Sequence, residues 1–91
     1  MKSIPILLNE EELSFWAYCY CYNNGPDDLI KELITDSHYA YWYCLEIKDD
    51  PEVRKYITDF NDAYEYCFNI KDDPEVRKYI TGSFDRYIFI L

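Results

Sequence analysis

The side chains that could carry out chemistry are few, and they do not form a catalytic pattern. The single histidine, His38, has no nucleophile pattern around it, and the serines (among them Ser14 and Ser37) stand where helix caps would be expected. A metal site would need converging cysteines and histidines, and one histidine is too few. The chain has two glycines and no glycine-rich phosphate loop. We therefore expect no catalysis, no metal and no cofactor.

The cysteines indicate packing positions. Cys21, Cys44 and Cys67 recur at equal intervals along the chain, which is typical of small buried side chains at equivalent sites. Cys19, close to Cys21 on a predicted helix, points to a different face. We expect reduced thiols in a cytoplasmic protein. The apolar run near the start is too short for a signal peptide or a membrane span.

The charge balance restricts the kind of partner. Eighteen acidic residues against nine basic ones give a net charge of −9. Nucleic acid and anionic membranes would repel such a chain, whereas a basic protein would attract it. The alternative is that the acidity only keeps the protein soluble.

An internal repeat predicts the architecture. Residues 47–58 recur letter for letter at residues 70–81, and weaker copies precede and follow them with the same 23-residue period. A fixed period of about 20 to 50 residues is the signature of a repeat array, and each unit reads as two helices. We predict one all-α domain over residues 1–91, a tandem helix-pair repeat array (a short α-solenoid) of about seven helices. Its units would be residues 13–35, 36–58 and 59–81, with a partial unit at 82–91.

Local signals place the helices of each unit. Asn9, Asp36 and Asp59 are predicted caps of the first helices, and Asp50 with Pro51 is a strong start signal for a second helix. Arg54 and Lys55 would then project outward. We expect an extended cap at residues 4–8 and a seventh helix after residue 82.

Positions that differ between copies are free to bind a partner. On the first helix of each unit these positions place aromatic residues in the first two copies and acidic or amide residues in the third. The candidate partner-binding residues are Trp16, Tyr39, Trp42, Asp62 and Glu65. Aromatic side chains contribute most of the binding energy at interfaces, and charges steer the encounter. The alternative is that the tryptophans pack against terminal segments or a second subunit.

The turns carry a second candidate, a row of acids at Asp27, Asp49 and Asp72. Stacked turns would align these carboxylates, which could mimic nucleic acid and occupy a basic channel. Neighbouring aspartates are also needed as helix caps, so capping alone is the competing explanation.

Residues 36–81 follow the pattern D-x-x-x-A-Y-x-Y-C-x-x-I-K-x-D-P-E-x-x-x-Y-I. This pattern resembles short two-helix repeats of phage and large-virus proteins, although cysteine stands where alanine is usual and the linker lacks glycine. The resemblance implies a mobile-element origin and, by analogy, an anti-CRISPR-like antagonist of a nucleic-acid-handling host defence complex, acting in the host cytoplasm. The alternative function is a homodimeric self-assembly or adaptor module.

Overall fold

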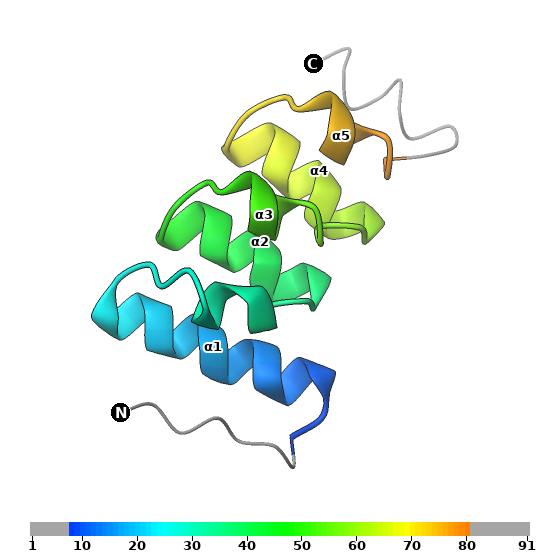
Figure 1. The fold of residues 1–91 in the computed structure, drawn as a ribbon. Helices are drawn as coiled ribbons and strands as arrows, with labels where there is room; N and C mark the ends of the chain where they lie inside the picture. The colour runs from blue at the N-terminus through cyan, green and yellow to red at the C-terminus, as the bar shows by residue number, and fades with distance from the viewer. Residues whose placement is uncertain (1–7, 81–91) are drawn as a thin grey trace.

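The computed structural model describes residues 8–80, and all regular structure within that range is helical. Longer and shorter helices alternate along the chain (Figure 1). In chain order they are α1 (Glu10–Asn24), the 3-10 helix η1 (Ile30–Leu33), α2 (Ser37–Glu46), α3 (Pro51–Arg54), α4 (Phe60–Asn69) and α5 (Pro74–Arg77). The prediction of an all-helical fold is confirmed for this part of the chain.

Each longer helix begins at a side chain that caps it. The Asn9 side-chain oxygen accepts a hydrogen bond from the Glu12 amide at 2.8 Å, and the Glu12 carboxylate accepts one from the Asn9 amide at 3.1 Å. This reciprocal pair is a capping box. Asp36 and Asp59 likewise accept from amides in the first turns of α2 and α4. Amides of a first helical turn have no carbonyl partner within the helix, and these side chains supply one. The predicted caps Asn9, Asp36 and Asp59 are therefore confirmed.

The short helices α3 and α5 depend on packing as well as on caps. Asp50 and Asp73 cap them, and each helix has a proline at its start. Such short helices are not stable alone in water. Burial of Val53 and Val76, which are 1% and 2% exposed, holds both turns against the longer helices.

The longer helices lie side by side in the order α1, α2, α4, with the short helices along one side of the row (Figure 1). Ala17, Ala40 and Ala63 are fully buried at corresponding positions on the three helices. Such small side chains let helix backbones approach closely. The largest fully buried residues belong to the same apolar core as these alanines; they are Tyr43, Tyr66, Ile30, Ile34 and Ile57.

Ser14 on α1 and Ser37 on α2 each join their helix to the segment that leads into the next longer helix. The buried Ser14 hydroxyl accepts hydrogen bonds from the Thr35 and Asp36 amides at 3.1 and 3.0 Å and donates to a carbonyl oxygen at 3.3 Å. At the corresponding position on α2, the Ser37 hydroxyl accepts from two amides at 3.0 Å. The expectation that these serines cap their own helices is therefore wrong, because their hydroxyls bond across to the following segment.

The prediction of about seven helices in a regular array with a 23-residue period is also wrong. Residues 8–80 contain five α-helices and one 3-10 helix. We call each longer helix and the short helix that follows it a pair: α1 with η1, α2 with α3, and α4 with α5. The first pair differs in geometry from the other two. Helix α1 has 15 residues where α2 and α4 have 10, and η1 stands where α3 and α5 are α-helical. The expected seventh helix after residue 82 lies outside the described residues, and so do residues 4–7 of the extended cap expected at residues 4–8.

The residues at the start of each short helix explain why the first pair departs from the others. Asp28 occupies the position that Pro51 occupies in the second pair. Proline fixes its backbone angle near the helical value, so it favours a regular α-helical first turn. Before η1, the chain also turns at Gly25, whose φ of 91° disfavours side chains with a β-carbon. Without the proline, the turn tightens into 3-10 geometry.

Candidate protein-binding surface

Aromatic side chains of α1 and α2 lie together on the surface of these two helices. The ring centroids of Phe15 and Tyr39 lie 5.5 Å apart, and Phe15 is 50% exposed. Trp16 and Tyr39 are half-buried. A groove of about 580 Å³ opens here, lined by Leu8, Asn9, Glu11, Glu12, Phe15, Trp16, Cys19 and Tyr39. The structure thus brings the predicted site residues Trp16 and Tyr39 together.

Trp42, also on α2, is linked to α4 through the only histidine. Its indole Nε1 donates to His38 Nε2 at 2.9 Å, and His38 Nδ1 lies 3.4 Å from Asp62 Oδ1. Because Nε2 accepts from Trp42, neutral His38 carries its proton on Nδ1, facing the Asp62 carboxylate. The predicted residues Trp42 and Asp62 are therefore connected by a side chain that sequence reasoning had set aside.

Glu65 is exposed on α4 and lies in a polar environment. Its carboxylate accepts a hydrogen bond from Asn69 Nδ2 at 2.9 Å, and the same amide nitrogen donates to the Tyr41 hydroxyl at 3.0 Å. The aromatic positions on α1 and α2 thus give way to polar and acidic ones on α4. We call Phe15, Trp16, Tyr39 and Trp42 the aromatic surface.

The three acids of the row belong to the turns before η1, α3 and α5, and these turns follow one another along one side of the molecule (Figure 1). Asp27 accepts hydrogen bonds from the Leu29 and Ile30 amides, both at 2.9 Å. Asp72 pairs with Arg77. These carboxylates are engaged by groups of the chain itself.

Asp49, the third acid of the row, belongs to a cluster between α3 and α4. Its carboxylate accepts from the Tyr66 hydroxyl at 2.8 Å and pairs with Arg54 at 3.0 Å and Lys71 at 3.6 Å. Arg54 also reaches Asp73 at 3.3 Å, and its guanidinium lies 5.7 Å from the Tyr66 ring centroid. The Arg54 side chain is only 14% exposed, so the expectation that it projects outward is wrong.

Lys31 is the counterpart of Arg54 between the first and second pairs. Its ammonium lies 2.7 Å from Asp50 Oδ2. Burial opposes ionisation of Asp50, but hydrogen bonds from the Lys31 ammonium and the Glu52 amide together lower the pKa of that carboxyl. Sequence reasoning missed these contacts between pairs. The signal was present: a base recurs at positions 31 and 54, and an aspartate at 50 and 73, with the same offset as the repeat itself.

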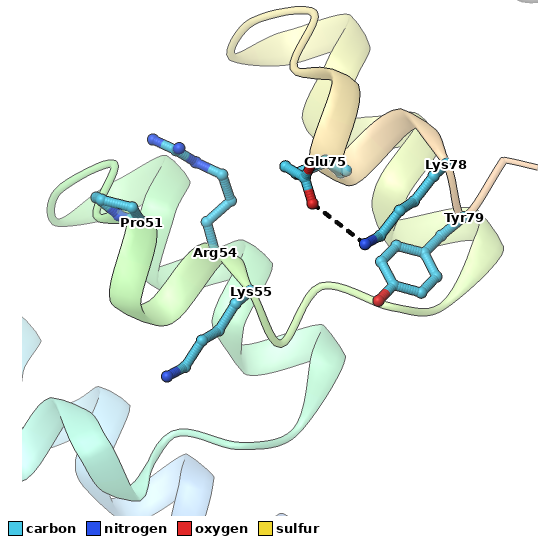
Figure 2. Close-up of a pocket in the computed structure, with 7 residues that line it drawn as sticks. Pro51, Arg54, Lys55, Glu75, Lys78 and Tyr79 are labelled. Atoms are coloured by element: carbon cyan, nitrogen blue, oxygen red, sulfur yellow. Dashed lines mark hydrogen bonds and ion pairs between the residues drawn. The ribbon is translucent and has the colours of Figure 1, made fainter.

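A second, smaller groove of about 210 Å³ lies between α3 and α5 (Figure 2). Its walls carry charges of both signs, and Glu75 pairs with Lys78 at 3.1 Å. The Lys78 ammonium also lies 5.4 Å from the centroid of the neighbouring Tyr79 ring. None of the predicted partner-binding residues lines this groove.

The cysteines offer no thiolate nucleophile at neutral pH. All four are free, and burial raises the pKa of each thiol, to about 12 for Cys44. A protonated thiol is a weak nucleophile, so these side chains act as small apolar groups in the packing.

Within residues 8–80, no group of three or more histidine, cysteine, aspartate or glutamate side chains is arranged to hold a metal ion. Among the helices of the same range, none is long and apolar enough to cross a membrane.

Comparison with known proteins gives no relative: no protein-family model matches the chain, and neither a curated protein nor a solved structure matches it significantly. The resemblance to phage and large-virus repeats therefore stays a hypothesis carried by the sequence pattern alone.

Proposed function

We propose that this chain is a protein-binding inhibitor whose aromatic surface docks on a basic surface of its partner. The observation that carries the proposal is the groove on α1 and α2, where three aromatic side chains stand beside two glutamates. Aromatic residues that are partly exposed and close together are typical of interface hot spots. A net charge of −9 favours encounter with a basic partner.

The proposal depends on the aromatic surface more than on the acidic row of the turns. Asp49 and Asp72 are already paired with the chain's own cations, so a partner would have to displace those cations to use them. A carboxylate that is already paired contributes little to new binding, because the existing interactions must first be broken. We keep a nucleic-acid-handling defence complex, as implied by the resemblance, as the partner class to be tested first.

The experiment is a binding measurement with purified defence complexes that have a basic nucleic-acid channel. Trp42→Ala is expected to raise the dissociation rate by about 30-fold, which corresponds to about 2 kcal/mol, while the salt dependence of association stays the same. Phe68→Ala is the matched control, because Phe68 is an exposed aromatic residue on α4 outside the aromatic surface. It is expected to leave binding unchanged.

Two results would contradict the proposal. Equal losses of affinity for Trp42→Ala and Phe68→Ala would show that the aromatic surface has no special part in binding. If Trp42→Ala instead converted a homodimer into monomers, as measured by light scattering, the surface would serve self-assembly. Thermal unfolding of both variants checks that each one is folded.

A further inference from the structure

The groove on α1 has walls of two kinds. Phe15, Trp16 and Tyr39 form an aromatic wall, and the rings of Phe15 and Tyr39 are inclined at 50° to each other. Burial, with a smaller contribution from Glu11, raises the pKa of the Tyr39 phenol, so this ring stays neutral. Cys19 adds a protonated thiol, because burial raises its pKa too. The aromatic wall therefore carries no charge of its own.

The groove is also lined by two carboxylates, from Glu11 and Glu12, which lie on α1 one helical turn before Phe15 and Trp16. One oxygen of Glu12 serves the capping box with Asn9. Within residues 8–80 neither carboxylate forms an ion pair with a basic side chain. By contrast, Glu52 and Glu75 on the short helices are paired with Lys55 and Lys78. The groove thus combines aromatic faces with negative charge that the described part of the chain does not neutralise.

This combination fits a flat cation. Aromatic faces attract cations through the ring quadrupole, and arginine is the cation most often found on them. A guanidinium is planar, stacks on aromatic rings and donates two parallel hydrogen bonds to a carboxylate. A volume of about 580 Å³ lies within the range of about 300–1,000 Å³ usual for ligand pockets.

We infer that the groove lined by Phe15, Trp16, Tyr39 and the glutamates Glu11 and Glu12 binds an arginine side chain presented by the partner protein. This inference rests on the proposed function and names the chemical group that the partner contributes. The guanidinium stacks on the aromatic wall while its N–H groups donate to the carboxylates. The remainder of the interface, including Trp42, is not required for this contact.

The test uses the full chain labelled with ¹⁵N and follows the indole N–H signal of Trp16 by NMR. The probe is N-acetyl-arginine methylamide, and its neutral isostere is the corresponding citrulline derivative. A single residue of this size is expected to bind with a Kd of about 1 mM. The arginine probe is expected to shift the Trp16 signal saturably and leave that of Trp42 unchanged, while the citrulline probe shifts neither.

Charge variants show whether the carboxylates take part. The double variant Glu11→Gln and Glu12→Gln removes both charges, while glutamine at position 12 preserves the capping box. It is expected to weaken binding of the arginine probe by about tenfold or more, since two charge-assisted hydrogen bonds are lost. The control is Glu52→Gln with Glu75→Gln, which changes the net charge equally on the short helices and is expected to have no effect.

Three outcomes would overturn the inference. They are an unshifted Trp16 signal, equal binding of the citrulline probe, and equal binding of N-acetyl-lysine methylamide, which would remove the preference for a guanidinium. If the arginine probe fails while Trp42→Ala still weakens binding of the partner, this inference falls and the proposed function stands. If the arginine probe binds but no partner protein does, the groove binds a guanidinium and the proposed function falls.

Discussion

The two junctions between neighbouring helix pairs contain corresponding residues, but the polar groups of these residues have different hydrogen-bond and ion-pair partners. Between the second and third pairs, the Tyr66 hydroxyl and the Arg54 guanidinium share the carboxylate of Asp49. Between the first and second pairs, the Tyr43 hydroxyl is buried without a hydrogen-bond partner among the described residues. Tyr43 and Tyr66 are both fully buried, so burial does not distinguish them.

A single turn position accounts for the difference. Asp49 precedes Tyr66 in the chain by the same interval at which Pro26 precedes Tyr43, and proline has no side-chain acceptor. The base of the first junction, Lys31, consequently has Asp50 as its close partner, with the exposed Asp28 at 3.5 Å. One substitution in a turn therefore changes the surroundings of both a buried phenol and a cation. We expect the polar contacts of the first junction to contribute less to stability than those of the second.

Of all the changes, removal of the cations Arg54 and Lys31 should have the largest effect on the free energy of unfolding and should separate the two junctions most clearly. Arg54→Met leaves two partly buried carboxylates, at Asp49 and Asp73, and removes the cation above the Tyr66 ring, so we expect a loss of about 2–4 kcal/mol in the free energy of unfolding. Lys31→Met leaves one buried carboxylate, at Asp50, and should cost about 1–3 kcal/mol. Urea unfolding at neutral pH measures both. A larger loss for Lys31→Met would reverse the comparison.

Alkaline pH tests whether the Tyr43 phenol is shielded from water. Burial raises its pKa from 10.0 to about 12, so the folded chain retains a proton that the unfolded chain releases near pH 10. The stabilisation is therefore complete below pH 10 and is lost as the pH rises towards 12, by at most about 1.4 kcal/mol per pH unit. Cys44, whose thiol pKa burial raises from 9.0 to about 12, adds a loss that begins near pH 9.

Tyr43→Phe should accordingly reduce the slope of unfolding free energy against pH between pH 10 and 12. Cys44→Ala is the companion variant, because it should reduce the slope from pH 9 upward. If Tyr43→Phe leaves the slope unchanged, the phenol ionises near its ordinary pKa and must be in contact with water. The contrast between the two tyrosines would then disappear.

Removing each hydroxyl should separate the two junctions at neutral pH. Tyr66→Phe breaks a hydrogen bond to a charged acceptor and should cost about 1–2 kcal/mol. Tyr43→Phe removes a buried hydroxyl with no described partner, so it should be neutral or stabilising. Thermal unfolding of the two variants provides the measurement. Equal losses would show that Tyr43 has an acceptor outside the described residues or a bound water.

The smallest expected effect comes from making the first junction resemble the second. Pro26→Asp places a carboxylate at the position that Asp49 occupies, where it could accept from Tyr43 and pair with Lys31. We expect a gain of about 0.5–1 kcal/mol, because the new hydrogen bond is partly offset by the loss of a rigid proline. The gain should vanish in the Tyr43→Phe background. A gain that persists there would arise from Lys31 or from the turn itself.

The helices whose starts are encoded locally could be predicted from the sequence. Asn9, Asp36 and Asp50 cap helices as expected, because a cap needs only a short polar side chain beside the free amides of the same turn. The repeat misled on the number and regularity of helices. Identity between copies covers the second and third pairs, whereas Asp28 in the place of a proline gives the first pair its 3-10 helix.

The candidate site could be predicted in part. That Trp16 and Tyr39 would lie on one side followed from their repeat positions, and the structure places both in one groove. The link from Trp42 through His38 to Asp62 could not be read from the sequence, because it depends on a contact between side chains far apart in the chain, on neighbouring helices. The burial of Arg54 escaped prediction for a similar reason, since its partner Asp73 belongs to the following pair.

The serine hydroxyls that join successive pairs have a consequence for slow motions of the chain. The amide hydrogens of Thr35 and Asp36 are held by Ser14, which is fully buried, so they can exchange with deuterium only when α1 separates from the segment leading into α2. The Thr58 and Asp59 amides are held by Ser37, which is half-buried. The exchange rates of Thr35 and Asp36 therefore report how often α1 parts from the segment leading into α2, whereas those of Thr58 and Asp59 also report unwinding at the start of α2, where Ser37 lies.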